Sequence, residues 1–500
     1  MPSRRIKKLL IANRGEIAVR IIRSARMMGI RTVAIFSAAD SGALHVALAD
    51  EAQPLGAPEP AQSYLNIKAI LEAALAAGAD AIHPGYGFLS ERAEFAQAVA
   101  DAGMTFVGPP SRVMDAVGDK LAARHLAIAV GVPVVPGLDL DSRDPSEARR
   151  FGEETGFPLL VKAAAGGGGR GMRVVETPAD LGAALEAASR EAAAAFGDGR
   201  VYLEKFVARP RHVEVQILGD NHGGIVALGE RDCSIQRRHQ KLVEESPAPN
   251  LPDSLRSRLL DAAIRLGRAA DYRNAGTVEF LVAGDQFYFL EVNARLQVEH
   301  PLTELRFNRD LVADQLAIAM GEPVVEPGAP RGCAIECRIN AEDAAHDFRP
   351  ATGTIAEVVL PQGPGVRVDT YLTRNAQVTP YYDSLLAKLI CWGEDREQAR
   401  RRMLGALGEF ALLGIETTAA FLADLIGSEA FAAAALSTAF IPEFLATWRP
   451  DDARLKAALL AAALRSRSGS ATPAVAAENH PSRTRSPWTA LGRFEPWSDR

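Results

Sequence analysis

The sequence predicts an α/β protein built from several domains. Its 500 residues exceed what one hydrophobic core usually organises, so two to four domains are expected. Short apolar strands alternate with amphipathic helices near the N-terminus, a pattern typical of a doubly wound parallel sheet. Two apolar runs then bracket a glycine-rich segment, which indicates a smaller α+β unit, and a larger α+β region follows.

The N-terminal segment should form the parallel sheet. We expect strands at Lys8–Ala12, Thr32–Phe36 and Ala81–His83, and helices at Glu16–Met28 and Asn66–Ala77. The first strand–helix turn lacks the glycines of a dinucleotide fingerprint, and no acidic residue after the second strand is placed to compensate. A nicotinamide cofactor is therefore disfavoured at this turn.

The middle segment contains a glycine-rich hairpin. Strands at Pro158–Ala163 and Met172–Glu176 flank Gly166–Gly171, and a helix at Ala179–Phe196 and a strand at Val201–Phe206 follow. Several chemistries share the G-x-G-x-x-G pattern, but here a strand follows where a Rossmann loop would open a helix. We therefore predict a mobile lid whose N–H groups cover phosphates, with Lys162 reaching the α/β-phosphates. A flexible surface hairpin is the alternative.

A basic stretch, Arg231–Lys241, follows two strands predicted at His212–Gly219 and Gly224–Glu230. It is too polar to continue a strand, so we interpret it as a local anion site. It lacks the interleaved aromatic residues that stack nucleic-acid bases. The net charge of −6 also provides no general basic field, so neither nucleic acid nor a membrane is an expected partner.

Two glutamates are predicted to face each other on a hairpin. Glu279 and Glu291 are twelve residues apart on apolar strands joined at Gly284–Gln286. A loop with an odd number of residues would place them directly opposite, with Cβ atoms about 5 Å apart. Such carboxylates repel unless a cation lies between them, and with the Asn293 side chain they suit Mg²⁺ or Mn²⁺. A solvated polar face is the alternative, which the flanking Phe and Leu residues disfavour.

A dense polar segment, Ala294–Glu304, begins where the second of these strands ends. Catalytic groups concentrate in such loops. The Arg295 guanidinium can bind a planar oxyanion through two N–H groups, and Glu299 can take its proton. An ion pair between Arg295 and Glu299 without a catalytic role is the alternative.

Lysine is scarce in this chain. Only nine of the 56 basic residues are Lys, so Arg is used wherever a general positive charge suffices. The remaining lysines mark positions that require a compact ammonium group. The lysines singled out on this basis are Lys120, Lys162, Lys205, Lys241 and Lys388.

Cysteine usage and the N-terminus indicate a cytoplasmic protein. The four cysteines form neither a disulfide framework nor a CxxC metal pair, and the alternating segment Cys333–Cys337 predicts a strand with buried small residues. The first apolar stretch is interrupted by Asn13, Arg14 and Glu16, which a signal peptide would not tolerate. No apolar run approaches the roughly 20 residues that span a bilayer.

Together, these motifs resemble the biotin carboxylase family over residues 5–448. The matching stretches are Ile11–Ala18, His83–Glu91, Gly118–Lys120, the glycine loop, Arg231–Glu245, Glu291–Glu304 and Glu336–Glu342. The resemblance implies an α/β ATP-grasp fold. It also implies these domains: a Rossmann-like pre-ATP-grasp domain (1–117), a linker helix (118–134), a lid domain (135–207), a C-terminal ATP-grasp and biotin carboxylase domain (208–450), and a helix with a flexible tail (451–500).

The resemblance further implies that ATP and bicarbonate carboxylate biotin through carboxyphosphate, as in the first half-reaction of an acetyl-, propionyl- or methylcrotonyl-CoA type of carboxylase. The residues implied for ATP are Lys120, Lys162, Gly167, Gly168, Gly169, Glu204, Lys205, Val207, His212, Gln236 and His239. Those implied for Mg²⁺ or Mn²⁺ are Glu279, Glu291 and Asn293. Those implied for bicarbonate are Lys241, Arg295, Gln297, Val298 and the general base Glu299. Tyr86 and Arg338 are implied for biotin, with Arg338 stabilising the biotin enolate.

The resemblance also implies partners. None of the lysines has a Met neighbour, whereas carriers present biotin on a Lys between two Met residues, so we expect a separate biotin carboxyl carrier protein or domain and a carboxyltransferase. A homodimer is implied, with Arg20 and Arg23 near its interface. Ala294 departs from the Thr that related chains often carry, and we expect a small effect. The alternatives are another ATP-grasp ligase, or a non-catalytic nucleotide-binding subunit, which the presence of Lys241, Arg295, Glu299 and Arg338 disfavours.

Overall fold

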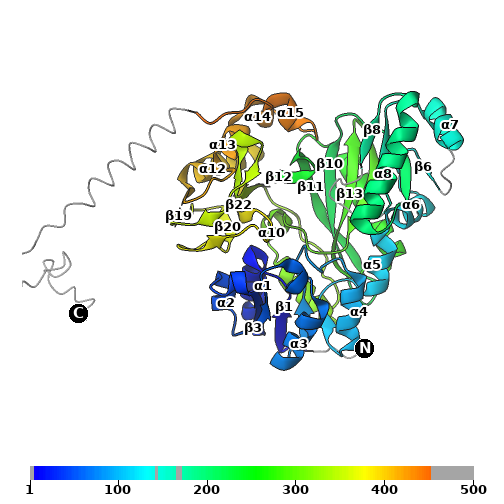
Figure 1. Cartoon of the computed structure of the whole chain (residues 1–500). Coiled ribbons are helices and arrows are strands. Elements are labelled where there is room, and N and C mark those ends of the chain that lie inside the picture. The colour runs from blue at the N-terminus through cyan, green and yellow to red at the C-terminus, as the bar shows by residue number, and fades with distance from the viewer. Residues whose placement is uncertain (1–4, 141–144, 165–171, 452–500) are drawn as a thin grey trace, which may run out of the picture. The chain divides into compact units, whose positions relative to one another are not determined.

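The computed structural model describes residues 5–140, 145–164 and 172–451. Chain contacts divide the protein after Arg449, and the elements below belong to the first unit (Figure 1). Gly167, Gly168 and Gly169 of the predicted lid lie outside the described residues, as does the tail from residue 452 onward.

A five-stranded parallel sheet forms the N-terminal part, in the order β3-β2-β1-β4-β5. Its strands are β1 (Lys8–Ile11), β2 (Arg31–Ser37), β3 (Glu51–Gly56), β4 (Ala81–His83) and β5 (Thr105–Phe106). The helices of this part are α1 (Gly15–Met27), α2 (Leu44–Leu48), α3 (Ile67–Ala77) and α4 (Ala93–Asp101). Leu9 packs with Ile21 of α1, whereas its neighbour Leu10 packs with Ile70 of α3. Helices therefore cover both faces, and the predicted doubly wound sheet is confirmed.

A four-stranded antiparallel sheet follows α5 (Ser111–Gly118) and α6 (Lys120–Ala129), in the order β6-β9-β7-β8. Its strands are β6 (Gly137–Asp139), β7 (Leu159–Ala163), β8 (Arg173–Val175) and β9 (Val201–Lys205), with helices α7 (Pro145–Thr155) and α8 (Leu181–Phe196). Leu159 and Val161 of β7 pack against Leu181 and Ala188 of α8. Strands β7 and β8 pair antiparallel, so the two strands predicted to flank the glycine loop are confirmed.

The largest sheet has eight strands in the order β14-β13-β10-β11-β12-β15-β22-β20, all paired antiparallel. Its strands are β10 (Arg211–Gly219), β11 (Ile225–Arg237), β12 (Gln240–Ser246), β13 (Asn274–Ala283), β14 (Gln286–Asn293), β15 (Cys333–Asn340), β20 (Val366–Thr370) and β22 (Leu385–Gly393). The helices of this region are α9 (Asp253–Ala269), α10 (His300–Phe307), α11 (Leu311–Ala319), α12 (Arg396–Glu409), α13 (Ala419–Gly427), α14 (Glu429–Ala432) and α15 (Phe440–Phe444).

Three short strand pairs complete the described structure. They are β16 (Glu342–Asp343) with β17 (Arg349–Pro350), β18 (Gly353–Thr354) with β21 (Gln377–Val378), and β19 (Glu357–Val359) with β23 (Ala411–Leu413). The strand predicted at Cys333–Cys337 is the start of β15, and its Cys337 is buried. The four cysteines are free thiols. In the described parts of the chain, no helix is long and apolar enough to cross a bilayer.

The prediction that the strand ends before Arg231 is wrong, because β11 continues to Arg237. Arg231 is fully buried in this strand. Its guanidinium donates hydrogen bonds to Glu214 at 2.5 Å and to Gln216 and Thr303 at 2.9 Å. Neighbouring strands thus supply every kind of partner that a buried cation needs, which a propensity argument on one strand does not detect.

Glu279 lies opposite Glu291 as predicted, but the predicted reason is wrong. The hairpin loop has two residues, since Ala283 pairs with Gln286. A regular ladder from that loop would place Glu279 opposite Leu290. A β-bulge skips Leu290 and shifts the pairing by one residue, which brings the two glutamates into register.

Candidate active site

A buried ammonium lies at the centre of the site. Lys241 Nζ on β12 lies 2.6 Å from Glu214, 2.9 Å from Glu279 and 2.7 Å from Glu299. Glu214 and Glu279 are directly opposite on β10 and β13, so their side chains extend from one face of the sheet. Burial alone would lower the pKa of Lys241, but the surrounding anionic groups raise that pKa well above its ordinary value. The side chain therefore remains a cation.

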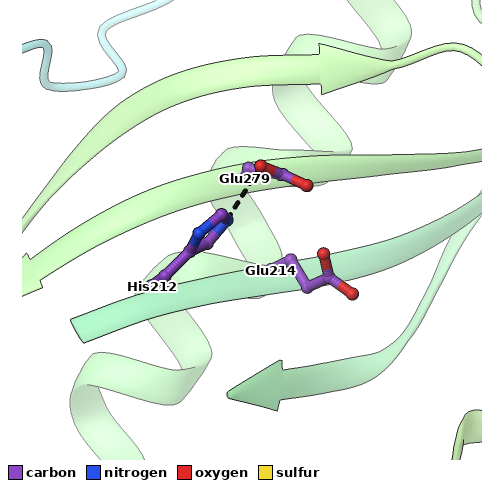
Figure 2. A group of neighbouring side chains, drawn as sticks. All are labelled: His212, Glu214 and Glu279. Carbon is purple, nitrogen blue, oxygen red and sulfur yellow. Dashed lines mark ion pairs between the residues drawn. The ribbon is translucent and has the colours of Figure 1, made fainter. Parts of the chain in front are cut away.

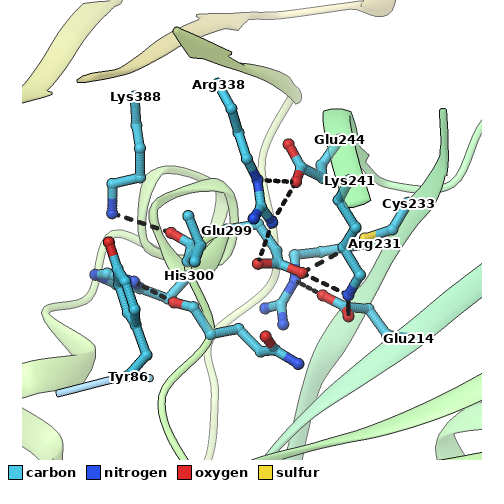
Figure 3. A network of polar contacts seen from close by, with 12 residues as sticks. Tyr86, Glu214, Arg231, Cys233, Lys241, Glu244, Glu299, His300, Arg338 and Lys388 are labelled. Atoms are coloured by element: carbon cyan, nitrogen blue, oxygen red, sulfur yellow. Dashed lines mark hydrogen bonds and ion pairs between the residues drawn. The ribbon is translucent and has the colours of Figure 1, made fainter. Parts of the chain in front are cut away.

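Glu299 lies between two cations at the start of α10 (Figure 3). Its Oε1 accepts a hydrogen bond from Lys241, and its Oε2 accepts one from Arg338 of β15 at 2.9 Å. Burial alone would raise the pKa of Glu299, but Lys241 and Arg338 hold that pKa well below its ordinary value. Arg338 also donates to Glu244 at 2.6 Å, and burial raises the pKa of Glu244 to about 7.

Arg295 lies just beyond β14 and is held by three neighbours. Its guanidinium donates to Glu91 at 2.8 Å, to Gln297 at 2.7 Å and to Asn293 at 3.0 Å. The alternative of an ion pair between Arg295 and Glu299 is therefore replaced by an ion pair with Glu91. Arg295 and Glu299 both remain in the site, with separate partners.

The residues expected at ATP come from three elements and the turns beside them. Lys162 of β7 forms a buried ion pair with Glu204 of β9 at 3.0 Å. The next residue, Lys205, donates to the Gly156 carbonyl at 2.8 Å. Lys120, the first residue of α6, lies 3.6 Å from Glu291. Val207 follows β9, and His239 lies in the turn between β11 and β12.

His212 connects this group to the carboxylates (Figure 2). Its imidazole lies 2.8 Å from Glu279 and 2.6 Å from the Gln236 side-chain amide. Burial lowers the pKa of His212, but the charge of Glu279 outweighs that effect and raises the pKa overall. Protonated His212 and Lys241 thus share the negative charge of Glu279.

Two arrangements of oxygen ligands are present near Glu279. His212, Glu214 and Glu279 offer ligand atoms within 4.8 Å of one another (Figure 2), but the Lys241 ammonium contacts both of these carboxylates. On the other side, Glu291 lies opposite Glu279, and Asn293 extends from the same face of β14 as Glu291. The second arrangement contains the residues predicted for the metal and lies next to Lys120.

Tyr86 lies in the turn after β4, and its hydroxyl donates a hydrogen bond to Glu16. A cavity of about 420 Å³ adjoins this ring and is lined mainly by aromatic side chains, including Phe88, Tyr371 and Tyr382. The cavity lies where the strand order reverses, between the ends of β1 and β4, a common ligand position in open α/β sheets. This position is consistent with a substrate near Tyr86.

Sequence reasoning missed several charged residues of the site. Glu91 and Glu244 lie inside stretches that matched the family pattern, so their positions were visible but their partners were not. Glu214 interrupts the apolar strand around Val213 and Val215, and a lone charge in a buried strand was the available signal. Lys388 was singled out only by the scarcity of lysine.

Three family models match consecutive parts of the chain. They are described as biotin carboxylase, N-terminal domain (residues 5–114), carbamoyl-phosphate synthase L chain, ATP binding domain (119–326), and biotin carboxylase C-terminal domain (336–443). Among curated relatives, a biotin carboxylase of Nostoc is 50% identical over 440 residues, covering 87% of this chain and 98% of the relative. One pyruvate carboxylase component of Methanothermobacter thermautotrophicus is 48% identical, covering 87% of this chain and 90% of the relative.

Solved structures agree with these matches. A crystal structure of a biotin carboxylase βγ-ATP complex from Campylobacter jejuni has a TM-score of 0.85 and 43% identity, covering 88% of this chain and 99% of that one. The biotin carboxylase domain dimer of Hydrogenobacter thermophilus 2-oxoglutarate carboxylase, with MgADP and bicarbonate, has the same TM-score and identity, covering 88% and 98%. The expected ATP-grasp fold is confirmed, and the chain belongs to the biotin carboxylase family of ATP-dependent ligases.

Proposed function

We propose that this protein uses ATP and bicarbonate to carboxylate the biotin of a separate carrier protein or domain. The observation that carries the proposal is the position of Glu299 between Lys241 and Arg338, with Arg295 at the start of the same loop. This arrangement provides a buried carboxylate base beside cations that can bind two successive anions. Family membership supports it.

In the first step, bicarbonate binds against Lys241, Arg295, Gln297 and Val298. Glu299 is a weak base while Lys241 and Arg338 both contact it. A bound anion competes for the Lys241 ammonium and thereby raises the proton affinity of Glu299. Glu299 then takes the bicarbonate proton as the oxygen attacks the γ-phosphorus, and the bond to ADP breaks to leave carboxyphosphate.

In the second step, carboxyphosphate separates into CO₂ and phosphate. Phosphate takes the N–H proton of the biotin ureido group, and the resulting nitrogen attacks CO₂. Arg338 stabilises the enolate oxygen of biotin, and Glu244 holds its guanidinium in place at 2.6 Å. Tyr86 borders the biotin from the N-terminal part.

The nucleotide is assigned to the lysines and hinge residues around β7 and β9. Glu279, Glu291 and Asn293 would hold Mg²⁺ or Mn²⁺, because their oxygen ligands share one face of the β13–β14 hairpin. The ion would neutralise phosphate charge during transfer. Lys120, 3.6 Å from Glu291, would add a second positive charge at the same phosphates.

The proposed partners are a biotin carboxyl carrier protein, a carboxyltransferase and a second copy of the chain, in a cytoplasmic setting. Arg20 is buried against Glu304 and Asp310, whereas Arg23 on the same helix is exposed and is the better candidate for a dimer contact. The carboxyl acceptor, for which we expected an acyl-CoA, is chosen by the transferase. Relatives are named for pyruvate and methylcrotonoyl-CoA.

The test is phosphate release from ATP with bicarbonate, measured with and without free biotin. We expect release that requires bicarbonate and rises with biotin. Release that is independent of biotin would indicate a different ATP-grasp ligase. ATP binding without release under any of these conditions would indicate a non-catalytic nucleotide-binding protein.

A further inference from the structure

Lys388 is the one lysine of the five singled out in the sequence that the proposed reaction does not use. It lies in the middle of β22, and its side chain is fully buried. Its ammonium donates a hydrogen bond to the Val298 carbonyl at 3.0 Å. A buried lysine loses the solvation of its charge, so the contacts it makes must compensate for that loss.

Lys388 and Arg338 are neighbours on one face of the large sheet. Lys388 of β22 pairs in register with Arg338 of β15, and on its other side with Asp369 of β20. Figure 3 shows both cationic side chains extending toward the loop that carries Glu299. Two like charges directly opposite on adjacent strands repel each other, so their placement requires anionic or carbonyl partners.

Those partners are consecutive residues of one turn. Arg338 holds the carboxylate of Glu299 at 2.9 Å, and Lys388 holds the backbone carbonyl of Val298. The sheet thus grips the turn at two adjacent points, one on a side chain and one on the main chain. This turn supplies Gln297, Val298 and Glu299, which are assigned to bicarbonate.

Lys388 also contacts the N-terminal part of the chain. Its Nζ lies 3.2 Å from Glu16, in the first turn of α1, and 6.0 Å from the centre of the Tyr86 ring. Glu16 in turn accepts the hydrogen bond from the Tyr86 hydroxyl. Asp369 lies 3.8 Å away and adds a second negative charge. One ammonium therefore links the turn assigned to bicarbonate with the residue assigned to biotin.

A guanidinium would not replace this ammonium. The Lys388 side chain has no exposed surface, so the larger planar head of Arg would have to displace Glu16 or the Val298 carbonyl. A small point charge can instead address three partners in different directions. This accounts for a lysine at this position in a chain that otherwise favours Arg.

We propose that Lys388 is a positioning residue that fixes the Gln297–Glu299 turn for bicarbonate and couples it to Tyr86. The proposal rests on the proposed function. It does not place Lys388 in contact with any substrate. Loss of the ammonium should therefore impair bicarbonate and biotin use while leaving the nucleotide site, which is built on other elements, unchanged.

The experiment compares Lys388→Met, Lys388→Arg and the control Lys68→Met, whose lysine is exposed on α3. Both Lys388 variants should raise the KM for bicarbonate by about tenfold or more, the range expected for loss of a hydrogen bond from a charged group. The Kd for ATP should change by less than about twofold. Lys68→Met should match the wild-type protein. Folded Lys388 variants with an unchanged KM for bicarbonate would overturn the proposal.

Lys388→Met leaves Glu16 without its cation, so a second variant guards against misfolding. Glu16→Gln combined with Lys388→Met removes both charges and keeps an acceptor for Tyr86, and a neutral replacement of both partners is often tolerated. The same rise in KM is expected of the double variant, and a wild-type KM in it would overturn the proposal. A wild-type protein without bicarbonate-dependent phosphate release would instead refute the proposed function itself.

Discussion

Replacement of Glu299 by Gln tests the central assignment. The substitution keeps the shape of the side chain but removes the negative charge that Lys241 and Arg338 share. Lys241 retains Glu214 and Glu279 at 2.6 and 2.9 Å, and Arg338 retains Glu244, so neither cation is left without an anionic partner. The fold should therefore survive the change, and any loss of activity should reflect chemistry.

The expected loss is the contribution of a general base, about 10²–10⁴-fold in rate. This corresponds to roughly 2.7–5.5 kcal/mol of transition-state stabilisation. The Kd for ATP should change by less than about fivefold, or roughly 1 kcal/mol, because Glu299 contacts none of the residues assigned to the nucleotide in the described structure. Biotin-dependent phosphate release and equilibrium nucleotide binding measure the two quantities separately.

A matched control is Glu397→Gln on α12, whose carboxylate faces solvent beside Arg400 and Arg401. It should retain wild-type turnover. Turnover of Glu299→Gln within tenfold of wild type would refute the role of Glu299 as a base. Loss of ATP binding by a folded Glu299→Gln would place this residue in the nucleotide site instead.

Three further predictions follow from individual residues. Glu291→Gln should raise the Mg²⁺ concentration needed for half-maximal phosphate release, and an unchanged Mg²⁺ titration would contradict the metal assignment. Hydrogen exchange at Gly166–Gly171 should slow when ATP binds, whereas slow exchange without nucleotide would argue against a lid. Burial lowers the pKa of His83 to about 3, so the unfolded chain takes up a proton below about pH 6.5 that the native state does not. Urea unfolding should therefore show stability falling between about pH 6.5 and 3, by up to about 1.4 kcal/mol per pH unit, and His83→Gln should reduce this slope.

Local patterns predicted most of the scaffold. The strand at Ala81–His83 and the helix ending at Ala77 occur at the predicted positions, because each carries a continuous apolar run or a helical apolar stripe bounded by turn residues. Strand β3 was missed, since it contains Pro54 and only partly buried residues, and at the edge of the sheet it carries no strong apolar signal. The division into the five predicted domains remains a prediction.

The residue types of the site were also legible in the sequence. Glu279, Asn293, Arg295 and Glu299 were identified because charged groups just beyond an apolar strand must be solvated or paired, and their spacing restricted what could pair them. The family pattern then added roles that spacing alone left open.

Only the tertiary structure decided which of these charges meet. The register of Glu279 with Glu291 depends on a bulge at Leu290, which no parity argument from loop length contains. The partners of Glu299 are Lys241 and Arg338, 58 and 39 residues away in the chain, and they reach it because β12 and β15 are adjacent in one sheet. Residue types and local periodicity are properties of short segments and are determined by the sequence, whereas strand order and register are properties of the whole packed sheet, and they alone bring these charges together.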